Sequence, residues 1–210
     1  MSNEKLNKVE KLISGRSPEE ALALLGKEFL SRSGGLPAPK ESSRTGQAGG
    51  VGGGLVFSTS FGLEDQAITH IIFSKNIPIK VFTLDTGRLF TETYAVWSRT
   101  RERYGKNIEV YSPNAEAVQK MVSAKGPNSF YESVDNRKEC CHIRKVEPLQ
   151  RALKGNAVWI TGIRREQSQN RQGLTSVEWD EKNKIVKFHP LFDWSYDEVK
   201  KFISHRFIKE

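Results

Sequence analysis

Two adjacent cysteines are the residues of this chain best suited to chemistry. Cys140 and Cys141 are the only cysteines among the 210 residues. A trans peptide holds their Cα atoms roughly 3.8 Å apart, whereas a relaxed disulfide needs about 4.4–6.8 Å. Two thiolates that share an external partner therefore explain the pair better than a bond between them. An iron–sulfur cluster is the obvious partner, and two buried thiols packed as small apolar side chains are the alternative.

The segment 58–66 has the composition of an anion-binding loop. It contains hydroxyl side chains, Gly62 and the start of a predicted helix, and backbone N–H groups at a helix start bind phosphate or sulfate. The segment matches neither a dinucleotide-binding glycine fingerprint nor a Walker A loop. An ordinary strand-to-helix turn capped by Ser60 is the structural alternative.

Two further segments, 84–88 and 161–171, could complete such a site. In the first, Asp85 can accept hydrogen bonds from ribose hydroxyls, and Gly87 lets a ligand approach the backbone. The same residues also favour an Asx turn. The second segment carries three arginines, and a guanidinium binds phosphate or sulfate through paired hydrogen bonds. Its alternative is a basic, solvated loop.

The elements that must position these segments alternate between strand and helix patterns. Strands are predicted over 55–57, 79–83, 108–111 and 158–161, and helices over 63–75, 90–104, 115–125 and 137–154. A hairpin is expected over 174–188, and a last helix begins at Ser195. This alternation predicts an α/β fold, a parallel sheet with helices on both faces. Ligands bind beyond the carboxyl ends of the strands in such a sheet, which is where the three polar segments fall.

Three regions of different composition divide the chain. Residues 1–32 form a predicted N-terminal helical segment, in which a second helix starts at Ser17 and Pro18. Residues 33–54 contain eight Gly and two Pro, and we expect a flexible insertion there. Residues 55–210 form the predicted nucleotide-binding domain.

Charge and composition favour a small anionic ligand and a cytoplasmic location. The formal net charge is +8 and the pI is about 9.5. No motif typical of nucleic-acid binding is present, so a phosphorylated or sulfated substrate is favoured over nucleic acid. The apolar runs fall short of the ~20 residues that span a bilayer, and two cysteines cannot build a disulfide framework. We therefore expect no membrane partner and a reducing compartment.

In this order, the three polar segments and the cysteine pair resemble the adenylyl-sulfate (APS) and phosphoadenylyl-sulfate (PAPS) reductases of sulfate assimilation. The resemblance covers residues 55–198 and implies an adenine-nucleotide α-hydrolase-like, Rossmann-like fold. The run KECCHIRKVEPL over 138–149 is similar to the branch of the family that holds a [4Fe-4S] cluster. The implied reaction reduces APS, or PAPS, to sulfite and AMP, or adenosine 3′,5′-bisphosphate, with thioredoxin as electron donor.

The resemblance also implies roles for individual residues. It implies a phosphosulfate loop of Ser58, Ser60, Phe61 and Gly62, adenosine contacts from Leu84, Asp85, Thr86 and Gly87, and a frame for adenine and the anionic groups from Gly162, Ile163, Arg164, Arg165 and Arg171. Cys140 and Cys141 would supply two of the four cluster ligands. Lys145, four residues after Cys141 and one α-helical turn on, would lie between cluster and substrate.

The sequence departs from the family at its C-terminal end. The family's second cysteine pair and its C-terminal nucleophilic cysteine are not present, so we expect a C-terminally truncated chain, and its own turnover stays open. A non-catalytic nucleotide-binding remnant and an ATP-using adenylating enzyme with a pyrophosphate loop remain as alternatives. Two chains with two cysteines each could also assemble one four-cysteine site as a homo-oligomer. The choice between APS and PAPS stays open.

Overall fold

One six-stranded sheet organises the fold, and the computed structural model describes residues 2–32, 53–167 and 175–207. The strands are β1 (Gly54–Ser58), β2 (Lys80–Leu84), β3 (Glu109–Tyr111), β4 (Asn156–Ile160), β5 (Val177–Asp180) and β6 (Ile185–Phe188). They lie in the order β3-β2-β1-β4-β6-β5. All neighbours pair in parallel except β5 and β6, which form the predicted antiparallel hairpin. The predicted α/β sheet is therefore confirmed, with one antiparallel strand at its edge.

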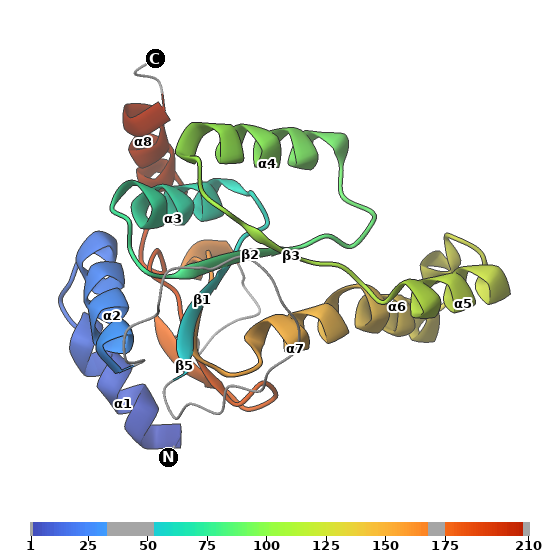
Figure 1. Cartoon of the computed structure of the whole chain (residues 1–210), viewed down its shortest axis with the longest axis horizontal. Coiled ribbons are helices and arrows are strands. Elements are labelled where there is room, and N and C mark those ends of the chain that lie inside the picture. Colours follow the sequence, from blue (N-terminus) through green and yellow to red (C-terminus); the bar gives the residue numbers. More distant parts are fainter. Residues whose placement is uncertain (1, 33–52, 168–174, 208–210) are drawn as a thin grey trace, which may run out of the picture.

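Helices cover both faces of this sheet (Figure 1). They are α1 (Ser2–Ile13), α2 (Pro18–Arg32), α3 (Leu63–Ser74), α4 (Thr91–Tyr104), α5 (Ala115–Lys125), α6 (Val134–Cys141), α7 (Glu147–Leu153) and α8 (Tyr196–Phe207). No helix among these described parts of the chain is long and apolar enough to cross a bilayer. The insertion predicted over 33–54 falls, apart from its last two glycines, outside the described residues.

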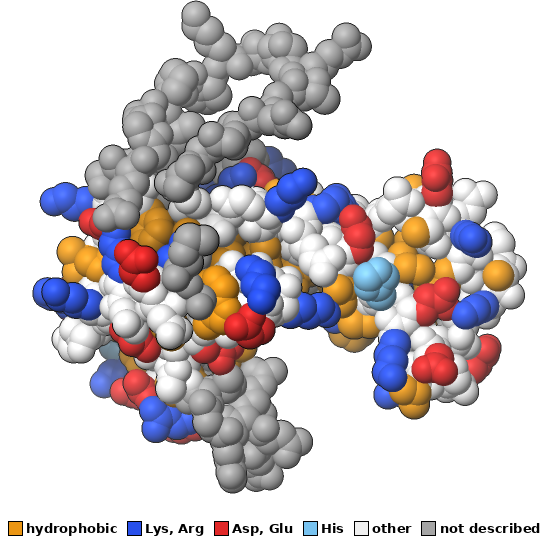
Figure 2. Space-filling view, turned by 90° about the horizontal axis from the view of Figure 1, so that it is seen from below, with side chains coloured by type: hydrophobic (Ala, Val, Ile, Leu, Met, Phe, Trp, Pro, Cys, Tyr) orange, Lys and Arg blue, Asp and Glu red, His pale blue; other side chains and the backbone are white. Residues whose placement is uncertain are grey.

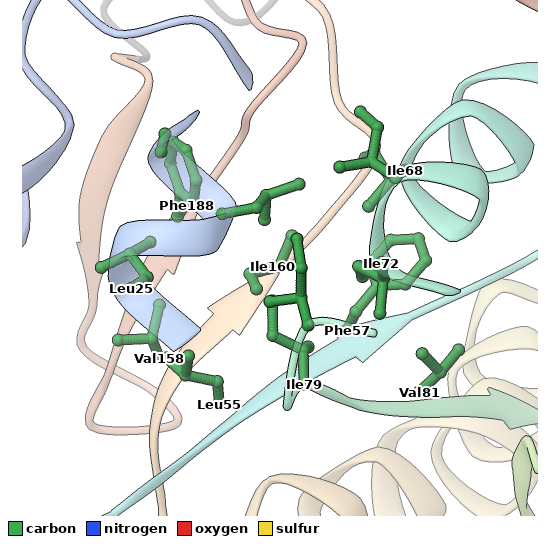
Figure 3. Close-up of a cluster of buried hydrophobic side chains, with 14 of the residues drawn as sticks. Leu25, Leu55, Phe57, Ile68, Ile72, Ile79, Val81, Val158, Ile160 and Phe188 are labelled. Carbon is green, nitrogen blue, oxygen red and sulfur yellow. The ribbon is translucent and has the colours of Figure 1, made fainter. Parts of the chain in front are cut away.

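The alternation of side chains along each strand builds two apolar layers. On one face, Phe57 and Ile160 pack with Leu25 of α2 and with Ile68 and Ile72 of α3 (Figure 3). On the other face, the neighbouring positions Val56 and Phe82 pack with Ala152 and Leu153 of α7. Because successive strand residues point to opposite faces, a strand covered on both sides must be apolar throughout, as the run Leu55-Val56-Phe57 is. These layers hold the carboxyl ends of β1, β2 and β4 in fixed positions.

The single helix predicted over 137–154 is wrong in its start and in its regularity. Helix α6 already begins at Val134, because the Ser133 side chain accepts a hydrogen bond from the Asn136 N–H at 3.1 Å and caps it. A π-helical turn, His142–Val146, then separates α6 from α7, with the Glu147 N–H bonded to the His142 carbonyl. Pro148 follows at once, and its ring would clash with the carbonyl four residues earlier in a regular α-helix. The wider π turn relieves that conflict.

The helices α5 and α6, with the 3-10 turn Ser129–Tyr131 between them, extend away from the sheet (Figure 1). We call residues 115–141 the arm. Lys125 of α5 connects the two helices of the arm. Its Nζ lies 2.6 Å from Glu139 Oε2 and 3.1 Å from Asn136 Oδ1, both on α6. In a space-filling view the arm is a separate lobe with apolar, acidic and basic side chains mixed on its surface (Figure 2). The two cysteines end α6, where the arm rejoins the body.

Candidate functional site

A cavity of about 450 Å³ opens at the carboxyl ends of β1, β2 and β4. All three polar segments singled out in the sequence contribute to its wall. Of the predicted site residues, the lining includes Ser58, Ser60, Phe61, Gly62, Leu84, Thr86, Lys145, Gly162 and Ile163. Asp85, Gly87, Arg164, Arg165, Cys140 and Cys141 do not line it, and Arg171 lies outside the described residues. The assigned roles of all these residues stay predictions.

The first loop, 58–62, is held in one conformation by its own hydrogen bonds and by aromatic stacking. The Phe61 N–H donates to Thr59 Oγ1 at 3.1 Å. Phe61 has a φ of 65°, which is unusual for a bulky residue and persists only where the surroundings hold it. Its ring stacks on Trp97 of α4 at 5.5 Å, and Trp97 stacks in turn on Tyr94 at 6.2 Å. The helix α3 that follows has no side-chain cap at Gly62, so its first N–H groups are available to an anion.

Asp65, in the first turn of α3, anchors the same loop. Its Oδ2 accepts the Ser60 N–H at 2.6 Å and the Ser60 hydroxyl at 2.7 Å. The side chain is 8% exposed, and burial raises its pKa to about 6 from 3.8, with the like charge of Glu64 adding to the shift and the two bonds from Ser60 opposing it. Our reading of the sequence missed this residue. An acidic side chain in the first turn of a helix, just after a hydroxyl-rich loop, is the signal that could have found it.

The raised pKa of Asp65 predicts a pH dependence of stability. The folded chain binds the Asp65 proton more tightly than the unfolded chain, so this group favours folding below pH 4 and loses that contribution as the pH rises through about 6. In chemical unfolding, the unfolding free energy of the wild-type chain should fall by on the order of 2 kcal/mol between pH 4.5 and pH 7.5 because of this group. The Asp65→Asn variant should lack this part of the pH dependence. Carboxylates whose pKa is lowered, such as Asp180, are present in both proteins. Their contribution cancels when the unfolding free energy of the variant is subtracted from that of the wild type, which leaves the contribution of Asp65. An equal pH slope in both proteins would contradict the prediction.

The second loop, after β2, forms the Asx turn that was the structural alternative for it. Asp85 Oδ1 accepts the Gly87 N–H at 2.9 Å and the Tyr94 hydroxyl at 2.8 Å. Gly87 has a φ of 68°, in the region that favours glycine. Thr86 is buried and lines the cavity, so the turn presents Thr86, rather than the Asp85 carboxylate, to the cavity.

The two described arginines of the third loop, Arg164 and Arg165, do not line the cavity. Arg164 is 5% exposed, and its guanidinium bonds Glu64 Oε1 at 2.8 Å and Glu166 Oε2 at 2.9 Å. Arg165 pairs with Asp193 on the surface. Among the described residues that line the cavity, Lys145 is the only cation. It follows that Arg164 ties the third loop to the start of α3, and that Lys145 supplies the positive charge next to the cavity.

The cysteine pair lies directly before the π turn that contains Lys145. Cys140 is half-buried and Cys141 is exposed. The predicted spacing of one α-helical turn between Cys141 and Lys145 does not apply, because the intervening turn is π-helical. Over 2–32, 53–167 and 175–207, no group of three or more His, Cys, Asp or Glu side chains is placed to hold a metal ion. The described residues therefore fit two ligands of a four-thiolate cluster and do not complete it.

Comparisons with known proteins agree with this architecture. The chain is 48% identical over 151 residues to adenosine 5′-phosphosulfate reductase of Allochromatium vinosum, covering 72% of this chain and 59% of that protein. It is 51% identical over 143 residues to the protein of the same name from Burkholderia cepacia, covering 68% and 57%. A crystal structure of phosphoadenylyl-sulfate reductase from Candida auris, a phosphate complex, superposes with a TM-score of 0.68 at 25% identity, over 98% of this chain and 87% of that one.

The chain spans 57–60% of the length of the first curated relatives it matches. Its residues 54–209 match the phosphoadenosine phosphosulfate reductase domain. That match includes every strand of the sheet and all three loops of the cavity wall. The chain therefore belongs to the phosphoadenosine phosphosulfate reductase family.

Proposed function

We propose that this chain binds adenosine 5′-phosphosulfate in the cavity and takes part in its reduction to sulfite and AMP in sulfate assimilation. The observation that carries the proposal is the cavity itself. Three loops and Lys145 meet there at the carboxyl ends of the strands, in a chain about half identical to proteins named adenosine 5′-phosphosulfate reductase. PAPS is the alternative substrate, thioredoxin is the proposed electron donor, and the cytoplasm is the proposed location.

The first loop and Lys145 suit the phosphosulfate group. The Ser58 hydroxyl accepts the Trp159 Nε1–H at 2.9 Å and keeps its own proton for an anion in the cavity, and the uncapped N–H groups of α3 are further donors. The Ser60 hydroxyl donates to Asp65 instead. In the proposed reaction a thiolate attacks the sulfur, the bond from sulfur to the bridging oxygen breaks, and AMP leaves with the electron pair. Lys145 would stabilise the charge that develops on the AMP phosphate. The attacking thiolate must come from outside this sequence, since Cys140 and Cys141 are the two proposed cluster ligands.

A [4Fe-4S] cluster is the cofactor that the cysteine pair fits in part. Such a cluster takes four thiolates, and this sequence contains two cysteines. Basic side chains flank the pair, among them Lys138 and Arg144, which suits an anionic cluster. We infer that Cys140 and Cys141 supply two ligands, and that a second copy of the chain or a separate segment supplies the others. The cluster, when bound, would provide a fixed charge next to the cavity.

Titration calorimetry on the whole chain tests the substrate. Adenosine 5′-phosphosulfate should bind with one site per chain, and AMP should compete with it. PAPS and ATP are the comparison ligands, because tighter binding of PAPS would reassign the substrate within the family. Pyrophosphate release from ATP would favour an adenylating enzyme. No heat with any of the four nucleotides would contradict the proposed function.

A further inference from the structure

Two arginines connect the cysteine-bearing arm to the cavity wall. Arg88 follows the second loop, and its guanidinium reaches the arm between α5 and the 3-10 turn. There Nη1 donates to the Pro127 carbonyl at 2.9 Å and Nη2 to Asn128 Oδ1 at 3.0 Å. The same guanidinium lies over the Phe130 ring, 4.8 Å from its centroid. The arm otherwise projects away from the sheet (Figure 1). Arg88 therefore links the segment between α5 and the 3-10 turn to the body of the protein.

The second connection comes from the π turn. Arg144 Nη1 donates to the Thr86 carbonyl at 2.6 Å. A Cβ added to Gly87 would lie 3.4 Å from the same nitrogen, an ordinary contact, so it is the positive φ of this residue that favours glycine here. Arg144 directly precedes Lys145, which lines the cavity, and follows the cysteine pair by three residues. The π turn thus carries this hydrogen bond and the cavity's cation, and it directly follows the two thiols at the end of α6.

Both connections converge on Thr86. Its carbonyl accepts from the Arg144 guanidinium, and its Oγ1 accepts the backbone N–H of Arg88 at 3.2 Å, which fixes the start of the Arg88 side chain next to the cavity wall. Thr86 is 7% exposed and lines the cavity. A ligand that contacts Thr86 therefore contacts the residue that accepts the Arg144 guanidinium and the Arg88 backbone N–H. Displacement of the arm would pull on Arg88 through Pro127 and Asn128, and so on the backbone next to Thr86.

We propose that Arg88 and Arg144 are positioning residues that make nucleotide binding in the cavity and the placement of the cysteine-bearing arm depend on each other. The inference deepens the proposed function and rests on it for the identity of the ligand. Coupling of this kind is reciprocal, so whatever factor the attached arm adds to nucleotide affinity, the nucleotide adds to arm attachment. Contacts of Arg88 are solvent-exposed, so the factor should be near the lower end of the usual range, about fivefold.

Hydrogen–deuterium exchange with and without AMP, together with AMP calorimetry, tests this inference. In the wild-type chain AMP should slow exchange over residues 127–141. Arg88→Ala and Arg144→Ala should each weaken AMP binding about fivefold and reduce this protection at equal AMP occupancy. Arg88→Lys, which keeps one donor, should be intermediate. Arg137→Ala removes an exposed arginine from the same arm and is the matched control, which should behave as wild type.

The outcomes separate the two proposals. The coupling is contradicted if AMP binds the wild-type chain without slowing hydrogen exchange in the arm. It is also contradicted if AMP slows that exchange equally in the wild-type chain and in the arginine variants. Both results leave the proposed function standing. If AMP does not bind but adenosine 5′-phosphosulfate does, the same exchange measurement with adenosine 5′-phosphosulfate decides the coupling. Failure of the wild-type chain to bind any of the four nucleotides contradicts the proposed function, and the coupling with it. A purely structural role would lower thermal stability in both arginine variants but keep AMP-dependent protection of the arm, which also overturns the inference.

Discussion

A Lys145→Ala variant should bind adenosine 5′-phosphosulfate about 10- to 100-fold more weakly than the wild-type chain, the range expected for a lost hydrogen bond to a charged group. Lys145 is the only cation among the described residues that line the cavity, and Glu64 and Asp65 are acidic residues of the same lining. Without the lysine, a multiply charged ligand would face a wall with no compensating charge. Calorimetry at low salt is the direct measurement.

Controls decide whether the effect is local to the cavity. Lys145→Arg keeps the charge and should retain part of the affinity for the ligand. Lys120 is an exposed lysine on α5, and Lys120→Ala should change the affinity little. The affinity of the wild-type chain should fall with added salt more steeply than that of Lys145→Ala, because one charge pair has been removed. Equal affinities of Lys145→Ala and wild type would mean that the lysine does not meet the ligand.

A Gly162→Ala variant should lose stability and ligand binding together. A Cβ at this position would lie 2.2 Å from Asp65 Oδ1 and 3.2 Å from Glu64 Cβ. Asp65 cannot simply turn away, because its other oxygen holds the backbone and hydroxyl of Ser60. Either the third loop moves or the Asp65–Ser60 bonds break, and each change distorts the cavity wall. Overpacking of this kind costs about 1–3 kcal/mol of unfolding free energy, measurable by urea denaturation.

The double variant Gly162→Ala/Asp65→Ala tests the cause. Removing the carboxylate makes room for the new methyl group, so the two substitutions should be non-additive, with the pair less destabilising than the sum of the singles. Ligand affinity should stay low in the double variant, because the first loop has lost the Asp65 carboxylate that bonds Ser60. Strict additivity would show that the collision with Asp65 is not what Gly162 avoids.

The organisation of the fold was predictable because its signals are local. Apolar runs of strand length alternated with helical patterns, and the starts of the second and last helices followed from Ser-x-x-Glu capping boxes. Both boxes are present, with the Glu20 and Glu198 side chains accepting the N–H groups of Ser17 and Ser195. Placing three loops at one edge then required only that parallel strands end on the same side. The family resemblance rested on the same three loops together with the cysteine pair.

The roles of several charged side chains were not predictable, since their partners are far away in the sequence. Arg164 pairs with Glu64, 100 residues earlier, a partner that no local pattern indicates, while its expected role toward the ligand stays a prediction. The anchoring role of Asp65 depends on its burial. Such choices are made by packing, which decides which polar groups lose water and must find partners.

The amino-acid sequence by itself determined the elements, their order and the edge of the sheet where a ligand is expected, because each follows from local patterns and from strand direction. Only the tertiary structure decided which side chains face the cavity, which are used up in ion pairs, and how the arm is attached. Those properties arise from the burial and pairing of residues brought together across the sheet, which local patterns do not record.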